Sequence, residues 1–121
     1  MQDTPKNFHK KLLGKVGEKG AEKHLKKLGY KILEKNFTTK IGEIDLIALD
    51  GETLVFIEVK TRSSENYGAP SQAVNKLKQE KYYLVATEYL KMKGLFDKEC
   101  RFDVVEVIFD QINVIKDAFS R

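Results

Sequence analysis

The sequence predicts one domain of α/β or α+β class, with a mixed central sheet flanked by helices. Two stretches with helical spacing of apolar residues lie before and after three short strand-like segments, and two more such segments follow. The expected order is therefore helix, three strands, helix, two strands, which is typical of a sheet covered by helices. With 121 residues, the chain has the length of a single domain.

The first helix is expected over residues 8–28, following a flexible arm at residues 1–7, so that the domain itself spans residues 8–121. Its apolar positions are Phe8, Leu12, Leu13, Val16, Ala21, Leu25 and Leu28. Glycines at positions 14, 17 and 20 each weaken a helix by roughly 1 kcal/mol relative to alanine. They leave two interpretations open: the helix starts late, or another part of the chain approaches its backbone closely. Gly29 supplies a C-terminal stop.

The remaining elements follow from alternation and turn residues. Strands are expected over residues 30–37, 44–49, 53–61, 101–109 and 112–115, a polar loop over residues 63–70, and a second helix over residues 71–90. Asp50-Gly51 is a strong hairpin signal between the second and third strands. Gly94 ends the second helix.

Composition favours a globular protein of the cytoplasm. Hydrophobic residues make up 41% of the chain and charged residues 33%, and no apolar run approaches the length of a membrane span. The first residues lack the apolar region of a signal peptide, and one cysteine cannot form an internal disulfide. The net charge is +4, and residues 1–35 hold ten lysines against four acids. This basic region attracts phosphate backbones or serves only as a solvated helix.

Two acids interrupt apolar strands near the Asp50-Gly51 turn. Asp45 stands within the second strand, and Glu58 lies near the end of the third, on the same face as Lys60. The hairpin can bring Asp45 and Glu58 side by side, since neighbouring strands lie about 4.8 Å apart. Two such carboxylates can share one Mg²⁺ ion, which offsets their burial and mutual repulsion. Lys60 can orient a water molecule and stabilise charge that develops on a phosphate. The alternative is a weak surface contact between Glu58 and Lys60.

Glu18 is a fourth candidate. Counted at 100° per residue, it lies within about 60° of Ala21 and about 20° of Leu25, so it borders the apolar stripe of the first helix. It is either a contributor to the site or a surface acid.

Further residues are candidates for nucleic-acid contacts. Gln79 and Tyr83 share one face of the second helix, where they can touch a nucleotide or pack on the surface. The basic candidates for phosphate contacts are Arg62, Lys76, Lys78 and Lys81. For the lysines, a solvated helix face is the default alternative.

Three blocks of sequence resemble a known family. They are residues 17–30 (GExxAxxxLxxxGY), 42–47 (GEIDLI) and 55–62 (VFIEVKTR). Together they resemble the bacterial YraN-type family of uncharacterised proteins. Lys78, the strand at residues 101–105 and Ala118-Phe119 extend this resemblance over nearly the whole chain.

The YraN-type family is similar in turn to the PD-(D/E)XK nucleases, near the archaeal Holliday-junction resolvases. The resemblance implies a restriction-endonuclease-like core with Glu18, Asp45, Glu58 and Lys60 in the four catalytic positions. It also implies Mg²⁺ or Mn²⁺ as cofactor, and it admits a homodimer. Ile44 stands before Asp45, where the superfamily motif has proline.

The expected function is that of a metal-dependent endonuclease that hydrolyses phosphodiester bonds in DNA, including branched or structured DNA. Asp45 and Glu58 are expected to bind the metal and Lys60 to position the attacking water. Glu18 is expected to add a ligand directly or through water. One alternative is a non-catalytic module that keeps the fold and binds nucleic acid or a protein partner. Another is an α/β protein with a purely structural role.

Overall fold

A computed structural model describes residues 6–62 and 75–120 of the chain, with side chains from residue 15 onward. Its elements are α1 (Lys6–Lys27), β1 (Lys31–Thr38), β2 (Glu43–Asp50), β3 (Thr53–Arg62), α2 (Lys76–Lys93), β4 (Cys100–Ile108) and β5 (Gln111–Ile115). The predicted order of two helices and five strands is therefore confirmed. No helix in the described part is long and apolar enough to cross a membrane.

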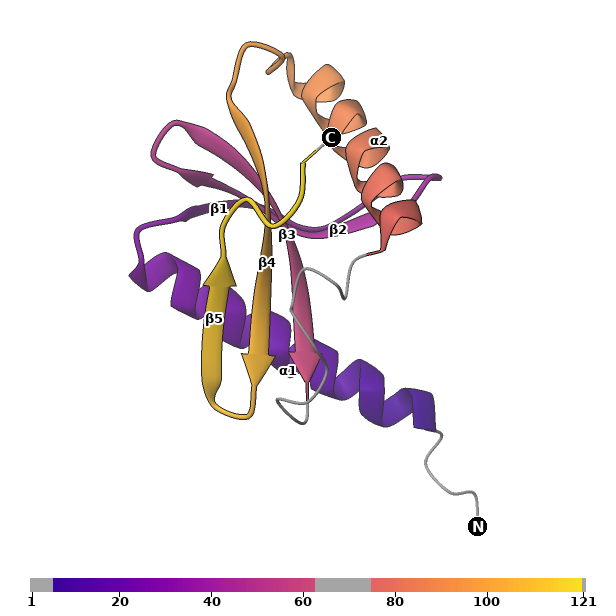
Figure 1. The fold of residues 1–121 in the computed structure, drawn as a ribbon, viewed down its shortest axis with the longest axis vertical. Helices are drawn as coiled ribbons and strands as arrows, with labels where there is room; N and C mark the ends of the chain where they lie inside the picture. Colours follow the sequence, from indigo (N-terminus) through magenta and orange to yellow (C-terminus); the bar gives the residue numbers. More distant parts are fainter. Residues whose placement is uncertain (1–5, 63–74, 121) are drawn as a thin grey trace.

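The five strands form one mixed sheet in the order β1-β2-β3-β4-β5 (Figure 1). Strands β3 and β4 are parallel, and the other three neighbouring pairs are antiparallel. A parallel pair needs a long crossover connection. Helix α2 lies in the connection between β3 and β4, which places its first turn near the end of β3 that carries Glu58.

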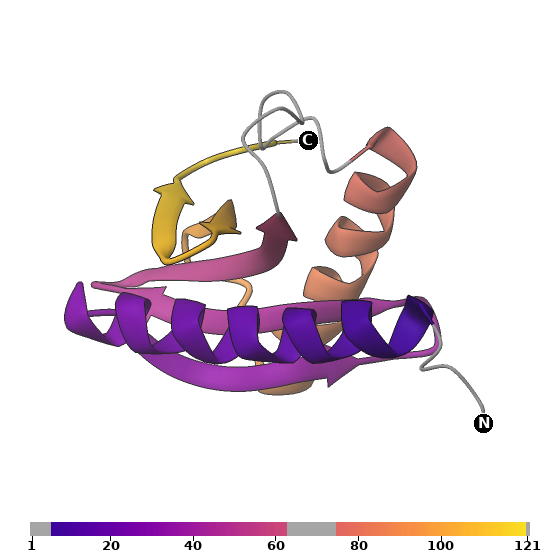
Figure 2. The ribbon, with the colours of Figure 1, turned by 90° about the horizontal axis from the view of Figure 1, so that it is seen from below.

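The two helices cover opposite faces of the sheet (Figure 2). Helix α1 buries Ala21 and Leu25 against a cluster that includes Val55 and Ile57 of β3. Helix α2 buries its aromatic side on the other face, against Phe56. Alternate residues of β3 thus enter different cores, as expected for a strand covered on both sides.

Both helices differ in extent from the prediction. Helix α1 begins at Lys6, so residues 6 and 7 belong to the helix rather than to an arm; residues 1–5 lie outside the described part. Helix α2 begins at Lys76 because Asn75 is extended (φ −72°, ψ 169°) and its side chain accepts a hydrogen bond from the backbone N–H of Lys78. The predicted loop and the first predicted turn of this helix, residues 63–74, are also outside the described part.

The apolar faces of the helices are narrower than predicted. The sequence places Val16 and Leu28 on the apolar side of the first helix and Leu77 on that of the second, but their exposed fractions are 61%, 54% and 69%. Helix α1 meets the sheet along Gly17, Ala21 and Leu25, which are spaced four residues apart, and Val16 lies outside this line. Leu28 follows the last helical residue. Leu77 belongs to the first turn of α2, at the solvent edge of the fold.

Gly17 accounts for the close approach that the sequence left open. A Cβ atom at this position would overlap with Oγ1 of Thr61 on β3. The backbone of α1 therefore rests directly on the end of β3. This contact fixes the neighbouring Glu18 near the carboxyl end of the same strand.

Candidate active site

The site lies where β2 and β3 separate. Their paired residues run from Asp50 and Thr53 to Leu46 and Ile57. One step further along this register, Asp45 stands opposite Glu58, as the hairpin predicts. There the backbone N–H of Val59 donates to Oδ2 of Asp45 over 2.8 Å. The Asp45 carboxylate thus accepts the hydrogen bond of a β3 backbone N–H at the point where the pairing between β2 and β3 ends.

The two carboxyl groups are buried and interact strongly. Asp45 is 9% exposed and Glu58 is 5% exposed. Burial, followed by the proximity of Glu58, raises the pKa of Asp45 well above its usual range. Burial acts on Glu58 in the same sense, but hydrogen bonding with Asp45 and the positive charge of Lys78 outweigh it and lower its pKa. Near neutral pH, and without a bound cation, the pair therefore holds one proton, mainly on Asp45.

Glu18 of α1 is half-buried, and its charge interacts with that of Glu58. Partial burial, followed by the charges of Glu43 and Glu58, raises the pKa of Glu18. Glu18 also contributes to the raised pKa of Asp45. Glu18 therefore acts on the pair through its charge, and within the described residues it does not form with Asp45 and Glu58 a group that could hold a metal.

Lys60 lies two residues beyond Glu58 on β3 and is half-buried. Among the ion pairs of the described residues, however, Glu58 is bound by another lysine. The ammonium group of Lys78, near the N-terminus of α2, contacts Oε2 of Glu58. Sequence reasoning treated Lys78 only as a candidate phosphate contact. The distance along the chain between Lys78 and β3 does not predict this ion pair, because the pair depends on how α2 docks on the sheet.

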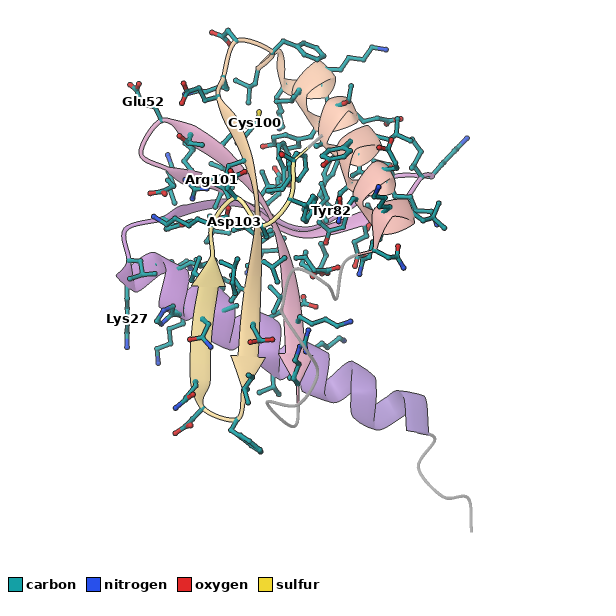
Figure 3. All side chains as sticks on the ribbon, viewed as in Figure 1. Lys27, Glu52, Tyr82, Cys100, Arg101 and Asp103 are labelled. Atoms are coloured by element: carbon teal, nitrogen blue, oxygen red, sulfur yellow. The ribbon has the colours of Figure 1, made fainter. Side chains whose placement is uncertain are left out.

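Tyr82 is a second contribution of α2 that the sequence did not assign to the site. It lies one turn after Lys78, is 2% exposed and points from α2 toward the sheet (Figure 3). Its hydroxyl group acts on the Glu58 carboxylate and helps to lower the pKa of that group. The Tyr82 pKa is itself raised, first by burial and then by the charges of Glu58 and Asp45.

The carboxylates open into a cleft of about 420 Å³ between the start of β2 and the N-terminal end of α2. Its charged and hydrogen-bonding walls include Glu43, Asp45, Glu58, Lys78, Lys81 and Tyr82. The cleft combines acids at its base with ammonium groups on its α2 side. A phosphate group could approach the lysines, while a cation binds the acids.

Two predicted nucleic-acid contacts require correction. The Tyr83 side chain is 6% exposed and packs against Phe102, with ring centroids 4.9 Å apart, so it belongs to the core. The Arg62 side chain is buried and pairs with Glu106 over 2.8 Å. Neither presents a free surface to a nucleotide. The adjacent helical position, Tyr82, is the one that faces the cleft.

The other candidates on α2 remain accessible. Lys76 and Lys81 are exposed, and Gln79 is half-buried. Lys81 lines the cleft, whereas Lys76 lies in the first turn of the helix. Their role in binding nucleic acid stays a prediction.

The donor set of the site suits a hard divalent cation. Carboxylate oxygens are the ligands that Mg²⁺ and Mn²⁺ prefer, and Asp45 and Glu58 already need a proton and an ammonium group to offset their repulsion. Within the described residues, no three His, Cys, Asp or Glu side chains form a group that could hold a metal. A metal held by the pair would therefore complete its shell with water or other oxygen atoms.

The sheet order, the crossover helix and the buried carboxylate pair define a protein with a restriction-endonuclease-like layout of α/β type. More particularly, the chain belongs to the uncharacterised protein family UPF0102, the YraN family, whose profile matches residues 17–107. The resemblance that the sequence blocks indicated is thereby confirmed.

Relatives in this family align over nearly their full lengths. The UPF0102 protein of Caldanaerobacter subterraneus subsp. tengcongensis is 48% identical over 121 residues, which cover 94% of this chain and 99% of the relative. That of Alkaliphilus metalliredigens is 46% identical over 112 residues, covering 90% of this chain and 98% of the relative. That of Clostridium botulinum is 47% identical over 121 residues, covering 94% and 98%.

Proposed function

We propose that this protein is a metal-dependent endonuclease that hydrolyses phosphodiester bonds in DNA, including branched or structured DNA. The observation that carries the proposal is the buried Asp45–Glu58 pair at the base of a cleft whose other wall is lined by lysines. An acid pair that is stable only when neutralised binds a divalent cation, and the adjacent ammonium groups suit a phosphodiester.

Each residue has a distinct role in this proposal. Asp45 and Glu58 would hold Mg²⁺ or Mn²⁺, and Glu18 would add a ligand directly or through water. The bound cation would lower the pKa of a water molecule and offset charge on the phosphate. Lys60, which follows Glu58 on the same strand face, orients the attacking water.

The direct test is cleavage of linear, flapped and four-way DNA by the purified chain with Mg²⁺ or Mn²⁺. We expect at least one of these substrates to be nicked, and we expect Lys60→Ala to lower the rate by a factor of about 10² or more. Lys93→Ala is the matched control, since Lys93 is an exposed lysine in the last turn of α2 and should leave the rate unchanged. Intact DNA throughout the panel would contradict the proposal.

The second candidate is a module that binds nucleic acid without cleaving it, which the exposed lysines of α1 and α2 favour. It predicts salt-sensitive DNA binding that survives Asp45→Asn and Glu58→Gln. Calorimetric titration of Mn²⁺ into the wild type and Asp45→Asn distinguishes the two candidates by whether this site binds the metal. The endonuclease requires Mn²⁺ binding that Asp45→Asn weakens, whereas the module does not.

A further inference from the structure

The contact between Lys78 and Glu58 sets two cations in competition. Glu58 is a proposed metal ligand, yet its Oε2 atom is already bound by the Lys78 ammonium group. A divalent ion and an ammonium group on the same carboxylate oxygen would repel each other at close range, in a buried setting with little screening. Only one of them can occupy that position.

The Lys78 side chain is placed so that it can leave. Its side chain is 42% exposed, whereas that of Glu58 is 6% exposed. Lys78 therefore reaches into the cleft from solvent, and its departure requires no repacking of the core. Tyr82, one turn further along α2, is 2% exposed and lines the same cleft, so the wall beside Glu58 stays packed after such a departure.

The position of Lys78 does not stabilise α2. It lies in the first turn of α2, where the helix dipole disfavours a positive charge, and this turn contains no acidic residue. The same turn favours an anion, and Lys81 adds a second positive charge to the cleft wall. A released Lys78 ammonium group therefore meets its best new partner in a phosphate group that enters the cleft.

We propose that the Lys78 ammonium group is an internal counter-ion that a divalent cation displaces from Glu58, and that the released group then binds a phosphate of the nucleic acid. This inference rests on the proposed function, because it assigns the metal to Asp45 and Glu58. Its consequence is positive coupling: metal binding frees Lys78 for the phosphate, and the phosphate draws Lys78 away from the metal site. By thermodynamic linkage, each ligand strengthens binding of the other by the same factor.

The test compares the full-length wild-type chain with Lys78→Met and with the matched control Lys81→Met. Lys81 lines the same cleft from the same helix but takes no part in the ion pair with Glu58. Calorimetry measures Mn²⁺ binding without DNA. Fluorescence anisotropy then measures binding of a short labelled DNA duplex with phosphorothioate linkages, with and without Mn²⁺.

We expect Lys78→Met to bind Mn²⁺ on the order of tenfold more tightly than the wild type, because the competing ammonium group is gone. We expect Lys81→Met to change Mn²⁺ affinity by less than about twofold. Mn²⁺ should tighten DNA binding on the order of tenfold in the wild type and in Lys81→Met, and leave it nearly unchanged in Lys78→Met. If Lys78→Met does not fold, Lys78→Gln keeps a polar chain and the same expectations.

Three outcomes would overturn the inference. Mn²⁺ affinity in Lys78→Met that equals or falls below that of the wild type would show that no competition exists. Retained enhancement of DNA binding in Lys78→Met would show that the coupling does not pass through this lysine. Either result leaves the proposed endonuclease standing, because wild-type metal binding and cleavage are measured separately. Absence of Mn²⁺ binding in all variants, with or without DNA, would contradict both.

Discussion

Two aspartates on β2 show how local partners decide the state of the same carboxyl group. Asp50, at the turn, receives hydrogen bonds and positive charge from Arg101 and Lys116, and its pKa is lowered. Asp45, five residues earlier, is buried beside Glu58, and burial followed by the proximity of Glu58 raises its pKa. One backbone N–H, from Val59, is too little to reverse the shift. The fold thus disfavours the ionised form of Asp45, and a bound cation would stabilise that form.

The raised pKa of Asp45 predicts that the metal-free protein loses stability as pH rises. Above about pH 4 the unfolded chain releases this proton, whereas the native state retains it, so the native state binds more protons. The free energy of unfolding should therefore fall between about pH 5 and pH 8, by at most about 1.4 kcal/mol per pH unit from this group. Urea unfolding at several pH values measures the slope.

Asp45→Asn removes the titrating group and should flatten this slope. Asp50→Asn is the matched control: the lowered pKa of Asp50 contributes stability that is lost only as pH falls through the acidic range, so the slope above pH 5 should stay. A slope in Asp45→Asn equal to that of the wild type would show that Asp45 does not hold the proton.

The position of Tyr82 and Tyr83 shows the limit of residue-level reasoning. The spacing of apolar residues leaves open whether Tyr82 or Tyr83 lies on the apolar side of the second helix, and it places Tyr83 on one face with Gln79. Adjacent helical residues point about 100° apart. Tyr83 enters the aromatic cluster with Phe102 and Phe119, while Tyr82 borders the cleft. The choice between them follows from the rotation of α2 on the sheet, which spacing alone does not determine.

At the scale of elements, the contact between α1 and β3 sets the position of Glu18. Gly17 and Thr61 touch where these elements meet, and Glu18 is the next residue along α1. Its helical phase predicted the direction of Glu18 relative to Ala21 and Leu25. The depth of the helix on the sheet follows from the missing side chain at Gly17.

Gly17→Ala should therefore destabilise the protein, because the added methyl group collides with Thr61. We expect a loss of about 1–3 kcal/mol in the free energy of unfolding, as for other overpacked contacts. The displaced helix should also weaken Mn²⁺ binding through Glu18. Urea unfolding and calorimetry measure the two effects.

Gly20→Ala is the control within the same helix. A Cβ atom there would lie 3.6 Å from Cδ1 of Ile112, an ordinary contact. Helix propensity should then raise the free energy of unfolding by up to about 1 kcal/mol. If both alanines stabilised the protein, the close approach at Gly17 would not be a constraint.

At the scale of the whole molecule, a network of hydrogen bonds around Arg101 lies at the other end of the sheet from the cleft. Arg101 of β4 donates to Asp50 and Asp103 and to the Tyr30 hydroxyl, each over 2.9 Å (Figure 3 labels Arg101 and Asp103). Asp103 is fully buried and also accepts from the backbone N–H of Asp117. These bonds tie the start of β1, the β2–β3 turn and the segment after β5 to β4.

Arg101→Leu should destabilise the protein by about 3–5 kcal/mol, because it leaves the buried Asp103 carboxylate without its cation. Lys116→Ala is the comparison, since this exposed lysine makes a 3.4 Å ion pair with Asp50 and should cost no more than about 1 kcal/mol. Under conditions in which Arg101→Leu remains folded, its Mn²⁺ affinity should match that of the wild type. A large loss of affinity would mean that the two ends of the sheet are coupled.

The sequence by itself determined the element order and the Asp45–Glu58 pair. Strand alternation has a fixed period of two, and the Asp50-Gly51 turn sets the register of the hairpin. Asp45 therefore stands opposite Glu58 whatever the rest of the fold does. The stops at Gly29 and Gly94 were determined in the same local way, since both glycines adopt positive φ after a helix.

Only the tertiary structure decided what surrounds the pair. Lys78 and Tyr82 reach Glu58 because α2 returns over the sheet at one particular rotation and depth. The same docking buries Tyr83 and leaves Leu77 exposed. Packing between elements distant in the chain sets such relations, and no local period encodes them. The sequence therefore predicts the two acids, but it does not predict the lysine that neutralises one of them.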